Sequence, residues 1–127
     1  MQKIIIVSNR LPVKLSELED GSLEYIQSEG GLATGLGSIY QEGNNIWLGW
    51  PGMEVKEASM QDAIRNDLSE MNLYPVFLTG EEINNYYEGF SNETLWPIFH
   101  YMSTYAVYHK TWWESYVDVN RKFCEAV

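Results

Sequence analysis

The chain has 127 residues, of which 45% are hydrophobic and 14% aromatic, so it holds enough apolar material for one domain with a sizeable core. Its 18 acidic and 8 basic residues give a net charge of −10, a field that repels polyanions and argues against a nucleic-acid partner. The opening apolar run, residues 4–7, is far too short to span a bilayer, and no signal peptide is visible, so we expect a cytoplasmic protein without a membrane partner.

The first predicted element is a strand over Lys3 to Ser8. Its unbroken run of β-branched residues indicates burial on both faces, as in a parallel sheet. An acidic turn follows at Glu17 to Gly21, and Leu23 to Gln27 are predicted to form a short strand that returns from it. We expect the carboxylates of this turn to be solvated rather than to form a catalytic pair.

A helix is predicted after Gly30-Gly31, because apolar residues between Leu32 and Tyr40 recur on one helical face. Ile46 to Trp50 then alternate like a strand, which stops at a Pro-Gly pair. Trp47 and Trp50 lie three residues apart on this strand and therefore face opposite sides. We expect one of them in the core and the other beside a cleft.

The second half of the chain continues the alternation of helices and strands. Residues 60–71 have helical spacing, and residues 73–78 are predicted to form a strand. Thr79 and Glu82 have the spacing of a capping box, and we expect the helix that they open to end near Gly89.

A last helix is predicted from about Trp112. Cys124 lies within it and is the single cysteine, so it cannot form an internal disulfide, and we expect a buried, inert thiol. The order of strands and helices indicates an α/β fold, and we expect one domain over residues 1–127.

Arg10 follows the first predicted strand directly. Ligands of open α/β sheets bind beyond the carboxyl ends of strands, and an arginine there can hold a phosphate through two parallel charge-assisted hydrogen bonds. A surface ion pair with one of the 18 acidic residues fits the same position. Position alone leaves both interpretations open.

The segment Glu-Gly-Gly-Leu at 29–32 opens the first predicted helix. Glycine lets a ligand approach the backbone, and the amides of a helix start favour a phosphate. The segment is neither a Walker loop nor a full Gly-x-Gly-x-x-Gly motif, so spacing alone favours an ordinary tight turn.

An aromatic block from Asn84 to Tyr101 is the third candidate. Aromatic rings can cover the C–H faces of a pyranose, although they more often form core. Tyr86 and Tyr87 diverge on a helix, so at most one points into a given site. His100 and His109 have no partner at metal-ligand spacing, so we predict no metal site, and we expect His100 to be semi-buried and hydrogen-bonded rather than a general base.

Four motifs follow one another in order: Val-Ser-Asn-Arg-Leu-Pro-Val at 7–13, Gly-Gly-Leu-Ala-Thr-Gly-Leu at 30–36, Trp-Leu-Gly-Trp-Pro-Gly at 47–52, and Tyr-Tyr-Glu-Gly-Phe-Ser-Asn-Glu-Thr-Leu-Trp-Pro-Ile-Phe-His-Tyr at 86–101. With the tail at 113–120, they closely resemble the trehalose-6-phosphate synthase family over nearly the whole chain. The resemblance implies a GT-B glycosyltransferase, in which two Rossmann-like domains enclose the active site. This chain then corresponds to the N-terminal, acceptor-side domain, a Rossmann-like three-layer α/β domain with a mostly parallel sheet. Its implied partner is the C-terminal donor-binding domain, which is absent from the chain.

The implied activity is that of a retaining hexosyltransferase, alpha,alpha-trehalose-phosphate synthase, which transfers glucose from UDP-glucose or another nucleotide-glucose to glucose 6-phosphate. By resemblance, Arg10, Tyr87, Trp96 and Trp50 contact the acceptor, with Arg10 on its phosphate. Gly30, Gly31 and Leu32 match the loop that approaches the donor diphosphate. No cofactor and no protein nucleophile are implied, because the leaving phosphate is thought to help deprotonate the acceptor.

We expect the fragment alone to be inactive, because an enclosed cleft needs the second domain. Three alternatives stay open: a glucosylglycerol-phosphate synthase, a noncatalytic sugar-phosphate-sensing domain, and an interaction module whose aromatic residues are all core. The donor nucleoside is open as well, because the residues that contact it lie mainly in the other domain.

Overall fold

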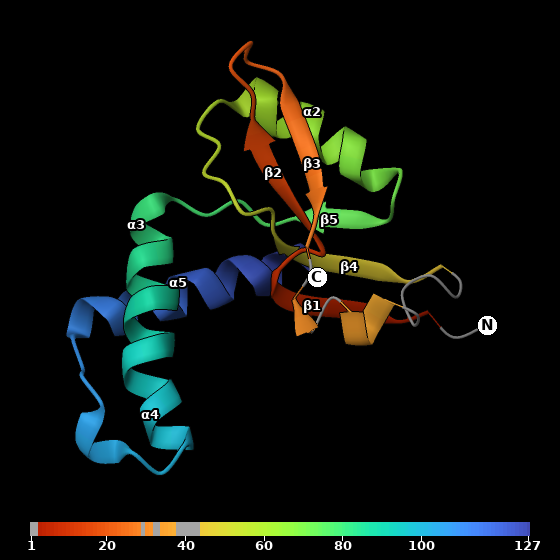
Figure 1. Ribbon diagram of the computed structural model, residues 1–127. Helices are drawn as coiled ribbons and strands as arrows, with labels where there is room; N and C mark the ends of the chain where they lie inside the picture. Colours follow the sequence, from red (N-terminus) through yellow and green to blue (C-terminus); the bar gives the residue numbers. More distant parts are fainter. Residues whose placement is uncertain (1–2, 29, 32–33, 38–43) are drawn as a thin grey trace. The chain divides into compact units, whose positions relative to one another are not determined.

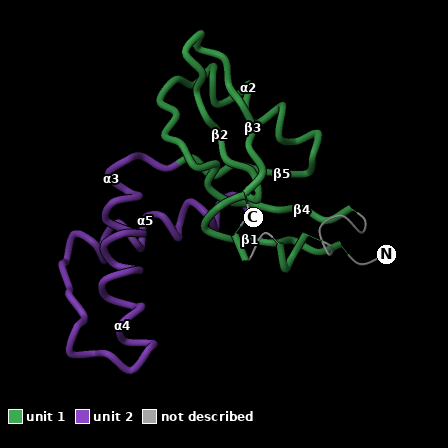
Figure 2. The backbone as a smooth tube through the Cα atoms, in the orientation of Figure 1, with its two compact units in different colours: residues 1–77 green, residues 78–127 purple. Residues whose placement is uncertain are grey.

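The computed structural model describes residues 3–28, 30–31, 34–37 and 44–127 (Figure 1). The chain divides into two compact units, residues 1–77 and residues 78–127, and we describe each by itself (Figure 2). Within the described ranges, no helix has the length and apolar character that a membrane crossing requires. The expectation of one domain over residues 1–127 stays a prediction.

A three-stranded parallel sheet organises the first unit. It consists of β1 (Ile5–Arg10), β4 (Ile46–Trp50) and β5 (Leu73–Pro75), in the order β1-β4-β5. All three strands were predicted from the sequence, although β5 ends three residues before the predicted limit. The α/β class with a mostly parallel sheet is therefore confirmed.

The prediction that β1 is buried on both faces is wrong. Ile6 belongs to the core, whereas Ile5 and Val7 are 46% and 48% exposed. Side chains alternate between the two faces of a strand, and only the face that carries Ile6 packs into the core cluster. β1 is also an edge strand of this sheet, paired only with β4 among the described strands.

A hairpin and a helix complete the first unit. β2 (Val13–Glu17) pairs antiparallel with β3 (Leu23–Gln27), and Gly21, with φ +83°, closes the predicted turn between them. The sequence predicted β3 but not β2. The helix α2 (Ala58–Ser69) agrees with its prediction. The buried core of this unit comprises Ile6, Leu11, Leu15, Trp47, Val55, Ile64, Leu68 and Leu73.

The second unit is helical. It contains α3 (Gly80–Glu82), the π-helix η1 (Ile83–Leu95), α4 (Trp96–Phe99), the short 3-10 helix η2 (Ser103–Tyr105) and α5 (Lys110–Ala126). The capping box is confirmed: the Glu82 amide donates to the Thr79 hydroxyl, and a Glu82 carboxylate oxygen accepts from the Thr79 amide.

The prediction that this helix ends near Gly89 is wrong, because helical structure continues to Phe99. Gly89 is a packing position: a Cβ built there would lie 2.7 Å from ring carbons of Trp112 on α5. The chain has no positive φ at Gly89, so this glycine does not end the helix. Pro97 lies within this run, just after η1 passes into α4.

Aromatic contacts join α5 to the π-helix. The ring centroid of Phe90 lies 4.7 Å from that of Tyr116, and Tyr86 stacks on the same Tyr116 ring at 5.9 Å. Val119 is the fully buried residue of α5. The prediction of a buried Cys124 is wrong, because this cysteine lies on an exposed side of α5.

Candidate functional site

Arg10 is the last residue of β1, at the carboxyl end of the parallel sheet. Its partner in register on β4 is Trp50, and the guanidinium carbon lies 5.6 Å from the centroid of the Trp50 ring. This distance is within the range of a cation–π contact. The fold therefore brings together Arg10 and Trp50, two predicted site residues that lie 40 positions apart in the sequence.

The indole of Trp50 has an unusual polar environment. Trp50 is only 8% exposed, and its Nε1 is buried without a hydrogen-bond partner among the residues that the structure describes. A buried tryptophan N–H normally finds an acceptor, and leaving one unsatisfied costs roughly 1–3 kcal/mol. The Arg10 cation beside this ring suits an anionic ligand.

Trp47 and Trp50 of β4 are both buried, and their placement on opposite faces of the strand stays a prediction. Trp47 belongs to the core cluster, so the expectation that one of the two is core is confirmed. Its indole N–H donates to Oγ of Ser8 at 2.7 Å, and that hydroxyl donates in turn to the carbonyl oxygen of Arg10 at 2.6 Å. The buried tryptophan is thereby linked to the strand end that carries Arg10.

The predicted glycine segment does start a helix. The Thr34 amide donates to the Gly30 carbonyl at 3.0 Å, and Gly31 is helical. Both glycines are exposed, neither has a positive φ, and a Cβ on either would meet nothing within 4 Å. No turn conformation therefore requires glycine here, and the backbone is open to approach. Leu32 lies outside the described residues.

Tyr87 and Trp96 belong to the second unit. Tyr86 packs on Tyr116, and burial raises its pKa to about 12. The Tyr87 ring lies beside it, with centroids 6.5 Å apart. Trp96, at the start of α4, is half exposed. Its ring stacks on His100 with centroids 3.8 Å apart.

The prediction of a semi-buried His100 is wrong, because the residue is exposed. The predicted hydrogen bond is present: Nδ1 lies 2.8 Å from the Trp96 carbonyl oxygen. The ring is exposed because the indole on which it stacks is itself half exposed. Its described contacts place His100 as a support for Trp96.

The structure thus places Arg10, Trp50, Gly30 and Gly31 in the first unit and Tyr87 and Trp96 in the second. Sequence reasoning missed the contributions of Ser8 and Gly49 to the Arg10 end of β1. Ser8 stands inside the first motif, two residues before Arg10, and Gly49 lies between the two tryptophans of the third. The available signal was a small residue within two positions of a candidate site residue in the sequence.

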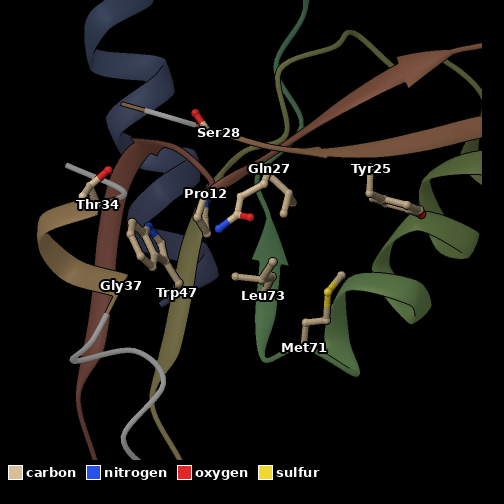
Figure 3. Close-up of a pocket in the computed structure, with 10 residues that line it drawn as sticks. Pro12, Tyr25, Gln27, Ser28, Thr34, Gly37, Trp47, Met71 and Leu73 are labelled. Carbon is tan, nitrogen blue, oxygen red and sulfur yellow. The ribbon is translucent and has the colours of Figure 1, made fainter. Parts of the chain in front are cut away.

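A cavity of about 340 Å³ opens elsewhere in the first unit (Figure 3). Trp47 and Leu73 of the core line it, together with Gln27 and Met71, and neither Arg10 nor Trp50 does. Three further lining residues, Ser28, Thr34 and Gly37, adjoin positions outside the described ranges, so we assign no site to it. Within those ranges, no group of three or more His, Cys, Asp or Glu side chains is placed to hold a metal ion.

Comparison with known proteins identifies relatives along the whole chain. The model of glycosyltransferase family 20 matches residues 2–127. A trehalose-6-phosphate synthase from Mycobacterium sp. (strain KMS) is 43% identical over 122 residues, which are 96% of this chain and 24% of the relative. The chain therefore spans about a quarter of the length of this curated relative.

Solved structures give the same result for the fold. The crystal structure of an alpha,alpha-trehalose-phosphate synthase (UDP-forming) from Burkholderia vietnamiensis superposes with a TM-score of 0.66 at 29% identity, over 99% of this chain and 26% of that one. A second such enzyme, from Burkholderia xenovorans in complex with glucose-6-phosphate, gives 0.65 at 25% identity, over 99% and 25%. The Rossmann-like fold of the N-terminal part of a GT-B enzyme is confirmed by these matches.

Proposed function

Because the chain belongs to glycosyltransferase family 20, we propose that it forms the acceptor-side part of a retaining hexosyltransferase, an alpha,alpha-trehalose-phosphate synthase. The reaction transfers glucose from UDP-glucose to glucose 6-phosphate. The acceptor is suggested by the relative solved with glucose-6-phosphate, and the donor by the relative described as UDP-forming. The remaining part of the protein supplies the donor-binding domain, and the cytoplasm, where sugar phosphates are made, is the proposed location.

The observation that carries this proposal is the pairing of Arg10 with Trp50. Arg10 places a guanidinium at the carboxyl end of β1, and the Trp50 N–H next to it lacks an acceptor among the described residues. A hexose phosphate suits this pairing, because its phosphate oxygens can accept charge-assisted hydrogen bonds from the guanidinium. In a chain of net charge −10, such a placed cation is what allows an anion to bind.

The other predicted residues take roles around the same acceptor and the donor. Tyr87 offers a hydroxyl, and the half-exposed face of Trp96 offers an apolar surface for the C–H groups of a pyranose. Gly30 and Gly31 leave room for the donor diphosphate at a helix start. Leu32 belongs to the same proposed loop.

The chain's part in the chemistry is to hold the acceptor so that its anomeric hydroxyl meets the donor sugar. This positioning raises the rate because the two substrates react while both are bound, instead of having to meet in solution. We assign no nucleophile to this chain. The leaving phosphate accepts the proton of the acceptor hydroxyl, so transfer proceeds on one face of the sugar. Closure of the cleft needs the donor-binding domain, and the 127-residue chain alone is therefore proposed to have no turnover.

The decisive experiment replaces Arg10 by Ala in the full-length protein and measures kcat/KM for glucose 6-phosphate. We expect a loss of roughly 2–4 kcal/mol in transition-state binding, because a charge-assisted pair is removed from a closed site. Arg65→Ala is the matched control, since Arg65 is also exposed and lies 5.0 Å from the centroid of an aromatic ring, that of Phe77. An unchanged kcat/KM for the Arg10 variant would refute the role of Arg10.

The same assay separates the rival acceptor. Glycerol 3-phosphate in place of glucose 6-phosphate tests a glucosylglycerol-phosphate synthase, and turnover with that acceptor alone would replace the proposed substrate. Saturable binding of glucose 6-phosphate without any turnover in the full-length protein would instead favour a sensing domain.

A further inference from the structure

We propose that Ser8 is a positioning residue, which fixes the backbone of Arg10 so that the guanidinium meets the sugar phosphate. This inference rests on the proposed acceptor-binding role of Arg10. It follows from the way in which the end of β1 is held, because the regular pairing of β1 with β4 is interrupted just before Arg10.

The ladder between β1 and β4 is interrupted just before Arg10. Val7 pairs with Leu48 and Arg10 with Trp50, so three steps along β1 match two steps along β4. Such a bulge leaves an extra residue unpaired and redirects the following side chain. The Arg10 segment therefore needs another constraint if its guanidinium is to keep one position.

The hydroxyl of Ser8 provides that constraint, because it both accepts and donates a hydrogen bond. Oγ accepts the indole N–H of Trp47 at 2.7 Å and donates to the carbonyl oxygen of Arg10 at 2.6 Å. A tryptophan N–H can only donate, so the hydroxyl must accept there and direct its own proton to the carbonyl. Because Trp47 is a core residue, the core determines the orientation of this hydroxyl and, through it, the peptide of Arg10.

Gly49 holds the same segment from the β4 side. A Cβ at Gly49 would lie 2.8 Å from the carbonyl carbon of Arg10 and 2.8 Å from the amide nitrogen of Leu11. The Leu11 amide, in turn, donates to the Trp50 carbonyl at 3.0 Å. The bulge therefore packs against Gly49, and Ser8 connects it to Trp47 by a hydrogen bond. The Ser8 hydroxyl acts on the backbone of Arg10 and does not itself need to touch the ligand.

The test compares Ser8→Ala and Ser8→Thr in the 127-residue chain, with glucose 6-phosphate and unphosphorylated glucose as the probes in a titration followed by NMR. Loss of one hydrogen bond from the Arg10 carbonyl should weaken glucose 6-phosphate binding by about five- to ten-fold, with little effect on glucose. Ser8→Thr keeps a hydroxyl and should bind within about two-fold of the original chain. Trp47→Phe removes the N–H donor together with part of a buried ring, so its free energy of unfolding is measured beside its binding, and we expect weaker glucose 6-phosphate binding.

Ser69→Ala is the matched control, because Ser69 also donates its hydroxyl to a backbone carbonyl of the first unit, that of Asn66, at 2.8 Å. It should leave the preference for glucose 6-phosphate over glucose unchanged. Equal losses in Ser8→Ala and Ser69→Ala, or a Ser8→Ala chain that keeps its phosphate preference, would overturn the proposal.

The ligand-free spectrum distinguishes failure of this inference from failure of the proposed function. In Ser8→Ala we expect the Leu11 amide and the Arg10 side-chain Nε–H resonances to shift, whereas Ser69→Ala leaves them in place. Unshifted resonances would show that Ser8 does not hold this segment. A chain that binds no glucose 6-phosphate but shows these shifts would count against the acceptor role of Arg10 and leave Ser8 as a purely structural tie, which also overturns the positioning role.

Discussion

Nζ of Lys122 lies 2.6 Å from Oε1 of Glu82, so the last turns of α5 are joined to the carboxylate that completes the capping box of α3. Partial burial pushes the pKa of Glu82 upward, but the hydrogen bonds from Lys122 and from the Thr79 backbone outweigh it and hold the pKa below its usual range. The ionised carboxylate therefore connects two helices of the second unit.

We predict that the second unit loses stability in acid, because the stabilisation from the Lys122–Glu82 pair is lost there. A carboxylate whose folded pKa is lowered stabilises the fold at pH values above its unfolded pKa, and the stabilisation is lost as the pH falls through the folded pKa. Lys122→Met should cost about 1 kcal/mol at neutral pH and should flatten the fall in Tm between neutral and acidic pH. Circular dichroism melts across that range measure the effect.

Lys110→Met is the control for this prediction, since Lys110 lies 3.8 Å from Glu114 and both side chains are well exposed. It should leave the acid profile unchanged. The role of the Glu82 pair would be contradicted if both variants lost stability in parallel at every pH.

Gly49→Ala should displace the end of β1. Its new methyl group would meet backbone atoms of Arg10 and Leu11 at 2.8 Å, and backbone cannot move aside cheaply. We expect a loss of roughly 1–3 kcal/mol in unfolding free energy and weaker glucose 6-phosphate binding. Urea denaturation and titration measure the two effects. Gly35→Ala, at a helical position where nothing lies within 4 Å of the added methyl, should cause no loss of stability, and equal losses in both variants would refute the steric argument.

Gly89→Ala should destabilise the second unit through Trp112. The added methyl would lie 2.7 Å from the indole ring, while alanine's better helix propensity offsets up to about 1 kcal/mol of the cost. We expect a net loss of roughly 1–2 kcal/mol. In a Trp112→Ala background the same change should instead stabilise, because only propensity remains. A double-mutant cycle by chemical denaturation measures this coupling, and a value near zero would disprove the contact.

Leu15→Ala should be among the more damaging apolar truncations in the first unit. Leu15 is 1% exposed, on the strand that pairs with β3, and its removal should cost about 2–5 kcal/mol. Leu18→Ala, at an exposed leucine of the same hairpin, should cost far less. Thermal unfolding of the two variants makes the comparison, and similar Tm losses would show that the hairpin is not part of the core.

Local patterns predicted those elements whose signal is contained in a few neighbouring residues. The alternation of Ile46 to Trp50 was sufficient to predict β4, and the Thr79–Glu82 spacing was sufficient to predict the capping box. Both signals lie within five neighbouring residues. β2 was missed because Leu11, Val13 and Leu15 alternate next to a proline. The continuation of the helix beyond Gly89 was missed because a glycine is typical of a helix end. The reason for this glycine is its contact with Trp112, which lies far away in the sequence.

The site shows the same division. Arg10 was identifiable because strand ends carry ligands, and Trp50 because the third motif contains it. The hydrogen bond from Trp47 to Ser8 joins residues 39 positions apart, and that from Ser8 to Arg10 residues 2 apart, beside a bulge in β1 that no sequence periodicity indicates. Patterns along a chain indicate which side chains carry chemistry, whereas the groups that orient them depend on tertiary packing.

The open edge of β1 has a consequence for handling the chain in solution. Among the described strands only β4 pairs with it, and the exposed Ile5 and Val7 give it an apolar face beside backbone N–H and C=O groups that can bond another strand. When the 127-residue chain is purified by itself, this edge is where intermolecular strand addition and precipitation would begin. A charged substitution at Val7 would therefore improve solubility without touching the core face of Ile6.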